Sequence, residues 1–490
     1  MNNLPKPLSV VEKVGYSLGD LAANLIFQTL VVFLAFFYTD VYGIPATAAA
    51  TIIFVGGLVG AFFNPIMGII ADRTVSRWGK FRPWILWTSV PFGISALLAF
   101  STPAFSPEGK LAYALITYVL LVIIYSANNL PYAALSGVMT SNMKQRNSLS
   151  AYRFVAVMIA QFVIQVLLLP LVLILGDGDK AAGFNSLMTV FCVVGTVFFL
   201  ITFFTTKERV ILPSDYSGSV YQDIKDLIGN KPWLIMLSVT ILVFVTLALK
   251  GGSSIYFFQY YLDNSATSEF LSNSGFNSGI AALNQWLTQA GLTKFEWPSD
   301  PATSAFSLFN AVGIITSIVG IGFSKPLADK FGKRDVFMTA LFISTLFILG
   351  LFWVPSNNPA MAIGLNLLHG LFYGVTIPLL WAMIADVADY SEWRYRRRAT
   401  AIIFSAMIFG LKLGLSIGGA SVALLLAHFG YDPLLQTQSD DTIQGIKLIV
   451  SVFPTVPFFV ATACLFTYRI NRALEQQIEN ELSIRRAASS

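Results

Sequence analysis

Polar residues recur at every fourth position of an apolar stretch near the start of the chain: Tyr16, Asp20, Asn24 and Gln28. In an α-helix this spacing places all four side chains on one face. If the helix crosses a membrane, they need polar surroundings, because lipid offers no hydrogen-bond partners. Carboxylates and amides can bind sugar hydroxyls in pairs, and aromatic rings can stack on sugar C–H faces. We therefore expect Asp20 and Asn24 to contact a substrate in a polar cavity; the alternative is that the stripe only joins this helix to a neighbour.

Polar residues inside later apolar stretches extend this set. The further candidates for substrate contact are Asn129, Tyr132, Arg153, Tyr373, Trp381 and Lys412, and Gln259, Asn310, Asn366 and His369 could line the same cavity. Arg153 begins its stretch, so its side chain could instead extend to the membrane surface. Lys412 lies twelve residues into its stretch. At that depth it needs an acid, a substrate anion or a shifted pKa.

The composition places most of the chain in lipid. Of its 490 residues, 55% are hydrophobic and 12% are charged, whereas a soluble chain carries about a quarter charged residues. This excludes an ordinary soluble enzyme and, despite a pI near 9.0, a nucleic-acid partner. Two cysteines in apolar runs and two histidines indicate neither a disulfide framework nor a metal cluster. We expect no enzyme activity and no cofactor.

Twelve apolar stretches are long enough to cross a membrane, since a spanning helix needs about 20 residues. They lie near 14–41, 46–71, 83–102, 110–135, 151–175, 184–206, 233–261, 304–328, 335–354, 360–385, 400–428 and 445–470. Twenty-four lysines and arginines fall on the side of the N-terminus and three on the other side. This imbalance predicts that both termini are cytoplasmic. We expect a monomer in a bacterial inner membrane, with membrane lipids as its other partners.

The loops divide the predicted bundle into parts. We predict an N-terminal six-helix bundle over 1–206, a cytoplasmic linker over 207–232, a C-terminal six-helix bundle over 233–470 and a cytoplasmic tail over 471–490. The C-terminal bundle carries an outer insertion at 262–303, in which GIAALNQWLTQAGL has helical spacing and predicts a short helix over the outer mouth. We expect this helix to be solvated and without a function of its own; the alternative is that it acts as a lid.

One loop motif occurs twice. The second span is followed by GIIADRTVSRWGKFRPW and the eighth by KPLADKFGKRDVF, so that Asp72 and Asp329 lie 257 residues apart. Parallel six-helix repeats are a transporter architecture. These loops resemble the signature loop of the major facilitator superfamily. The resemblance implies an all-α integral membrane fold of twelve transmembrane helices in two six-helix pseudo-repeats, working by alternating access.

Acids near these loops could close the cytoplasmic side through ion pairs that break when the halves rock. The candidates for this gate are Asp72, Arg77, Asp329, Asp386 and Asp389. Arginines 396–398 are the nearest partners in sequence for Asp386 and Asp389. The alternative is that the basic residues only set the topology.

A closer resemblance covers all twelve spans. The segments VGYSLGDLAANLIFQ, FYTDVYG, NPIMGIIADRTVSRWGKFRPWIL, NNLPYAAL, AYRF and ADVADYSEW resemble the glycoside–pentoside–hexuronide:cation symporter family, which includes the melibiose permease and glucuronide carriers. The resemblance implies transport of a sugar or glycoside driven by sodium or protons. It also implies that Arg153 contacts the sugar and that Lys412 faces the cation site.

The chain departs from this family at the cation site. The family's three cation-binding acids correspond to Gly60, Asn64 and Asn129, whereas the hydroxyl at Ser126 is retained. We therefore weigh three mechanisms. A proton could couple transport through Asp20 or another acid, with Lys412 as partner. Asn64 and Ser126 are further coupling candidates, although an amide cannot accept a proton and amide and hydroxyl oxygens alone would bind sodium weakly. The protein could be a facilitator or exchanger without a cation. The substrate could be an anion, such as a uronide, neutralised by Lys412 and Arg153. A transport-dead sugar sensor is the alternative from another class.

Overall fold

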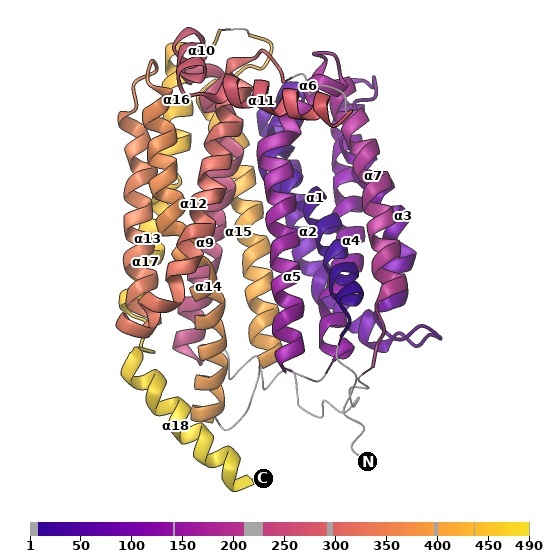
Figure 1. Ribbon diagram of the computed structural model, residues 1–490, viewed down its shortest axis with the longest axis vertical. Helices are drawn as coiled ribbons and strands as arrows, with labels where there is room; N and C mark the ends of the chain where they lie inside the picture. The colour runs from indigo at the N-terminus through magenta and orange to yellow at the C-terminus, as the bar shows by residue number, and fades with distance from the viewer. Residues whose placement is uncertain are drawn as a thin grey trace. The chain divides into compact units, whose positions relative to one another are not determined.

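The computed structural model describes residues 8–140, 143–209, 229–291, 297–395, 400–435 and 437–489, and within these ranges its regular structure is helical (Figure 1). The chain forms two compact units. The first comprises residues 1–215 with 276–307 and 432–436, and the second comprises 216–275, 308–431 and 437–490.

The first unit contains six long helical segments, several of them built from consecutive helices. They are α1 (Val10–Phe36) with the π-helical turn η1 (Phe37–Val41), α2 (Ala46–Arg73), α3 (Arg82–Ala99), α4 (Pro107–Met139), α5 (Met143–Phe162) with the π-helical turn η2 (Val163–Leu167) and α6 (Leu168–Leu175), and α7 (Lys180–Thr205). Helix α11 (Phe276–Gln289), predicted from the insertion, also belongs to this unit, and none of its residues is buried.

The second unit repeats this order with additions. Its helices are α9 (Lys231–Tyr256) with the π-helical turn η3 (Phe257–Tyr261), α10 (Asn264–Asn273), α12 (Pro301–Phe331), α13 (Lys333–Gly350) with the 3₁₀ turn η4 (Leu351–Trp353), α14 (Pro359–Tyr395), α15 (Thr400–His428), α16 (Asp440–Ser451), α17 (Thr455–Phe466) and α18 (Arg472–Ser489). At the start of α10, Ser265 and the Ala266 N–H donate to Asp263 and lower the pKa of its carboxyl.

The predicted twelve-helix architecture is confirmed. Eleven of the described helical segments are long and apolar enough to cross a membrane. The remaining one is α3, which is 18 residues long and packs against α4 and α7. Several boundaries differ from the prediction; α14, for example, ends at Tyr395 rather than at 385. The fifth segment begins at Met143 rather than 151, because polar residues extend the helix beyond its apolar part. The twelfth divides into α16 and α17 near Pro454, which has no N–H to donate.

Helix packing repeats between the two units. Helix α1 packs against α5 and α7, as α9 packs against α15 and α17. Helix α3 packs against α4 and α7, as α13 packs against α14 and α17. The first segment of each unit also ends in a π-helical turn, at Phe37–Val41 and at Phe257–Tyr261. The two predicted pseudo-repeats therefore correspond to the same arrangement of helices built twice.

The repeated loop motif makes equivalent contacts in each unit. Its glycines, Gly79 and Gly332, have φ values of +107° and +91°, which favour glycine. Arg82 donates from Nη2 to the Phe203 carbonyl at 2.7 Å, and Arg334 donates from Nη1 to the Tyr468 carbonyl at 3.2 Å. Each arginine thus ties its loop to the chain near the end of the last spanning helix of its own unit.

Glu208 caps the amino end of α3. Its carboxylate accepts the backbone N–H groups of Lys80, Phe81 and Arg82 at 2.9, 2.8 and 2.9 Å. Gly79 makes this approach possible, since a Cβ at that position would lie 2.4 Å from Cδ of Glu208. The carboxylate satisfies N–H groups that have no acceptor inside the helix.

We expect Glu208→Ala to lower the apparent melting temperature of the purified protein. Charge-assisted hydrogen bonds at such an end are each worth on the order of 1 kcal/mol. The matched control is Glu108→Ala, which removes an exposed acid from the first turn of α4. Equal melting temperatures for the two variants would contradict the capping role.

Helices α12 and α14 approach each other at glycines. A Cβ on Gly320 would lie 2.0 Å from the Leu371 carbonyl oxygen, and one on Gly374 would lie 2.1 Å from the Ser317 carbonyl oxygen. Gly313 and Gly370 also leave less than 3.0 Å for an added Cβ. Small residues allow such backbone contact between membrane helices. We call these four glycines the glycine seam.

Candidate functional site

An ion pair forms the polar centre of the first unit. Arg153 on α5 donates from Nε to Oδ2 of Asp20 on α1 at 2.9 Å. The Asp20 side chain is 5% exposed and that of Arg153 is 32% exposed. Because α5 begins at Met143, Arg153 lies ten residues inside the helix. Its side chain is directed to Asp20, which contradicts the alternative that it extends to the membrane surface.

Two stacked tyrosines adjoin this ion pair. The rings of Tyr16 and Tyr132 lie 4.5 Å apart with an interplanar angle of 9°. Each hydroxyl donates to the backbone carbonyl of the other residue, at 3.0 and 2.7 Å. The guanidinium carbon of Arg153 lies 5.8 Å from the Tyr16 ring and 5.5 Å from the Tyr132 ring. These contacts hold α1, α4 and α5 together and fix the position of the charge pair.

Asn24 completes the centre on the next turn of α1. Its Nδ2 donates to the Asp20 carbonyl at 2.9 Å and to the Asp20 carboxylate at 3.3 Å. Asn24 and Gln28 are partly exposed, whereas Tyr16 and Asp20 are buried. The predicted stripe therefore divides into two parts. Tyr16 and Asp20 join helices, and Asn24 presents an amide that solvent or a ligand can reach.

The positions that the family resemblance aligns with cation-binding acids lie on α2 and α4, which pack together. Asn64 is 7% exposed and Ser126 is fully buried. Ser126 donates its hydroxyl to the Val122 carbonyl at 2.9 Å. Asn129 is partly buried, and the adjacent Asn128 donates to the Thr88 hydroxyl at 2.8 Å. This region supplies amide and hydroxyl groups in place of carboxylates.

The predicted residues of the second unit are more dispersed. Tyr373 is partly buried, and its ring stacks with those of His369 at 5.6 Å and Phe458 at 6.1 Å. Lys412 on α15 is partly buried. Trp381 on α14 is exposed, at 37%. The side-chain contacts described for Tyr373 and Trp381 do not join them into one cluster.

A polar cluster inside the second unit involves Lys250, which was not among the candidates from the sequence. Its amine donates to Oδ1 of Asn366 at 2.6 Å, and Nδ2 of Asn366 donates to the Phe309 carbonyl at 2.6 Å. The depth of Lys250 within α9 is the signal that could have identified it, because charges inside spans are costly.

A second ion-pair cluster joins α13, α14 and α18. Lys333 donates to both carboxylate oxygens of Asp386, at 2.7 and 2.9 Å, and lies 2.8 Å from Oε1 of Glu475. Asp386 was a predicted gate residue, and Lys333 belongs to the second copy of the loop motif. Glu475 was not predicted, because the tail resembles an ordinary charged helix.

The other predicted gate residues are not joined to this cluster by any described contact. Arg77 is exposed and stacks on Trp78, with its guanidinium carbon 4.4 Å from the ring centroid. Asp329 lies near the end of α12 and Asp389 lies on α14. Asp72 lies in the last turn of α2, and its side chain is outside the described part of the structure. Arginines 396–398 also lie outside it.

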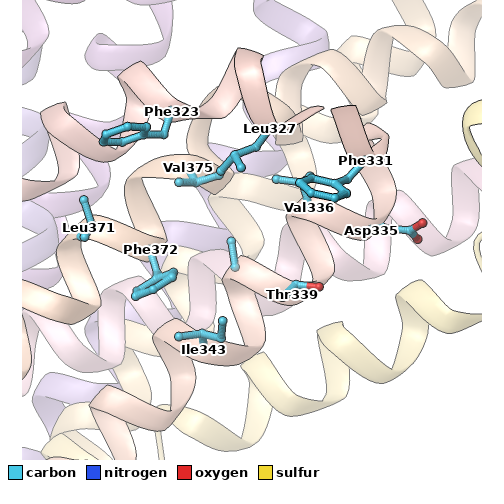
Figure 2. A pocket seen from close by; sticks show the side chains of 11 residues that line it. Phe323, Leu327, Phe331, Asp335, Val336, Thr339, Ile343, Leu371, Phe372 and Val375 are labelled. Carbon is cyan, nitrogen blue, oxygen red and sulfur yellow. The ribbon is translucent and has the colours of Figure 1, made fainter. Parts of the chain in front are cut away.

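An apolar pocket of about 530 Å³ opens between α12, α13 and α14 (Figure 2). Asp335 and Thr339, both on α13, are its polar lining residues. Phenylalanines from α12 and α14 and aliphatic residues form the rest of its wall, as Figure 2 shows. None of the predicted substrate-binding residues lines it. A sugar needs more hydrogen-bonding groups than Asp335 and Thr339 supply, so we do not assign this pocket as the substrate site.

Two similarly built six-helix sets with polar side chains inside their spans define a membrane transporter of the major facilitator type. The chain belongs to the MFS/sugar transport protein family, which it matches over residues 15–290 and 300–472. It is 34% identical over 475 residues to the inner membrane symporter YicJ of Escherichia coli, covering 96% of this chain and 95% of that protein. It is 29% identical over 467 residues to the isoprimeverose transporter of Lactiplantibacillus pentosus, covering 94% and 89%.

A solved structure supports the fold. The crystal structure of a D-xylose–proton symporter matches with a TM-score of 0.58 at 14% identity, covering 91% of this chain and 96% of that one. The resemblance to glycoside and hexuronide symporters predicted from the sequence motifs is confirmed at the level of the family.

Proposed function

We propose that the protein carries a sugar or glycoside across the inner membrane by alternating access of its two six-helix halves, with both termini in the cytoplasm. The observation that carries this proposal is the Asp20–Arg153 pair beside the Tyr16–Tyr132 stack and the accessible amide of Asn24. A guanidinium and an amide suit sugar hydroxyls, and the buried tyrosine stack holds the guanidinium in place. The isoprimeverose transporter and other sugar-transporting relatives favour the same substrate class.

We further propose that a proton is the coupling ion. Asp20 is the one Asp or Glu that is buried among the described residues, and the positions of the family's cation-binding acids hold Gly60, Asn64 and Asn129. Protonation of Asp20 removes the charge that holds Arg153. The guanidinium can then turn to the substrate, which links proton occupancy to substrate occupancy.

The Lys333 cluster is the proposed gate of the second half. Its ion pairs are partly exposed, and partly exposed pairs contribute modest stability. Pairs of this strength can break in each transport cycle. The ion pairs that close the gate then join α13, α14 and α18.

Uptake of labelled glycosides into proteoliposomes tests this proposal. We expect a proton gradient to stimulate uptake and a sodium gradient to have no effect. Asp20→Asn is expected to abolish stimulation by the proton gradient. Saturable stimulation by sodium would contradict the proton assignment. Glycoside exchange at the same rate with and without either gradient would favour a facilitator. Binding of a glycoside without any flux would contradict transport and identify a sensor.

A further inference from the structure

Lys250 lies near the middle of a predicted membrane span. It is 19 residues from the start of α9 and 11 residues from the end of η3. At a rise of 1.5 Å per residue these separations are about 28 and 16 Å. A lysine side chain cannot cover either distance to reach a membrane surface, so its amine must be accommodated within the protein.

The partners of this amine are fixed in orientation. The Phe309 carbonyl can only accept and the lysine amine can donate, so the Asn366 amide must direct its NH₂ group to Phe309 and its oxygen to Lys250. The ring of Phe309 lies 5.6 Å from the amine. Asn366 therefore fixes the position of the Lys250 amine.

The amine of Lys250 has no acidic partner in the described residues, where no carboxylate oxygen lies within 4.0 Å of it. An ammonium group has three N–H donors, and Asn366 accepts one of them. The lysine side chain is partly exposed. When the amine is protonated, two of its donors thus remain for a ligand that brings negative charge.

Arg153 cannot supply this function in the same way. Its charge is already compensated by Asp20 at 2.9 Å, so an anion bound there would meet a carboxylate as well. The sequence offered Arg153 and Lys412 as the pair that would neutralise an anionic substrate, in one of three mechanisms left open. In the described structure, Lys250 is instead a basic residue that lies inside a span and has no acidic partner.

We propose that Lys250, positioned by Asn366, forms a subsite for the acidic group of an anionic sugar, a carboxylate or a sulfonate. This inference rests on the proposed function, since it names the class of sugar that is carried. Binding of the anion supplies the missing counter-charge through charge-assisted hydrogen bonds. A neutral sugar of the same shape lacks this contribution.

Binding of matched sugar pairs to the purified full-length protein tests the proposal. The probes are 4-nitrophenyl glucuronide with 4-nitrophenyl glucoside, and the corresponding galacturonide with the galactoside. Each pair differs at C6, which carries a carboxylate or a hydroxymethyl group. We expect the wild-type protein to bind at least one uronide more tightly than its neutral partner. Lys250→Gln is expected to weaken uronide binding about 10- to 100-fold and to leave binding of the neutral glycoside unchanged.

Two further variants keep the result interpretable. Asn366→Asp places a carboxylate against Lys250 and is expected to weaken uronide binding without removing the lysine. Lys447→Gln is the matched control, because Lys447 lies over the rings of Tyr261 and Phe352, outside the cluster. Melting curves check that each variant is folded.

The outcomes separate this inference from the proposed function. Tighter binding of the neutral glycosides, or an equal effect of Lys250→Gln on both members of a pair, overturns the anion subsite and leaves sugar transport standing. Failure of the wild-type protein to bind any of the four probes counts against both. If Lys447→Gln weakens uronide binding as much as Lys250→Gln does, the weaker binding results from the loss of any positive charge, and the subsite is rejected.

Discussion

Arg153→Gln is expected to lower sugar uptake about 100-fold, because a hydrogen bond from a charged donor to the substrate is worth up to about 3 kcal/mol. The variant loses the guanidinium that contacts Asp20 and both tyrosine rings. Asp20 is then left as a buried carboxylate with the Asn24 amide as its described partner. Uptake of a labelled glycoside into proteoliposomes measures the loss, and melting curves measure the accompanying decrease in stability.

Two comparisons distinguish a role in transport from a role in folding. Asp20→Asn with Arg153→Gln removes both charges and is expected to recover stability but not uptake. Arg469→Gln removes one positive charge from an exposed position and is expected to leave uptake unchanged. Recovery of uptake in the double variant would contradict a direct role for the pair in binding or coupling.

Gly320→Ala is expected to prevent the second half from packing and to reduce strongly the yield of folded protein. The added Cβ would lie 2.0 Å from the Leu371 carbonyl oxygen and 3.1 Å from Cα of Gly374. Both contacts are with backbone, so no side-chain rotation relieves them. The helices must separate at the glycine seam, with loss of their packing contacts. Size-exclusion chromatography of detergent-solubilised protein measures the folded fraction.

The same helix provides a matched control. Gly322 lies two residues away, and an added Cβ there meets nothing within 4 Å. Gly322→Ala is expected to be neutral or stabilising, by up to about 1 kcal/mol from helix propensity. If both substitutions reduce the folded fraction equally, the glycine seam does not determine the packing of α12 on α14.

The sequence predicts the helices and their duplication well, because apolar length and the repeated loop motif are local signals. It predicts side-chain partners poorly, because these depend on helix packing. Asp20 and Arg153 were both identified, yet their pairing joins residues 133 positions apart. The start predicted for the fifth span, eight residues late, also left open the incorrect alternative for Arg153.

The remaining partners show the same limitation. Asp386 was assigned the nearest arginines in sequence, whereas the described structure joins it to Lys333, 53 residues earlier. Glu208 resembles any exposed acid until the loop turns at Gly79 and directs three N–H groups to it. Lys250 belongs to no motif, and only its depth in α9 distinguishes it. Composition and spacing cannot specify contacts that helix packing creates between distant segments.

Entrance counterflow tests the central claim most directly, because it requires a carrier but no ion gradient. Proteoliposomes are loaded with an unlabelled glycoside that stabilises the purified protein and are diluted into a trace of the same labelled glycoside. We predict transient accumulation of label with the wild-type protein and none with Arg153→Gln. A wild-type protein that binds the glycoside without counterflow, or an Arg153→Gln variant with undiminished counterflow, would contradict a sugar carrier built around the Asp20–Arg153 pair.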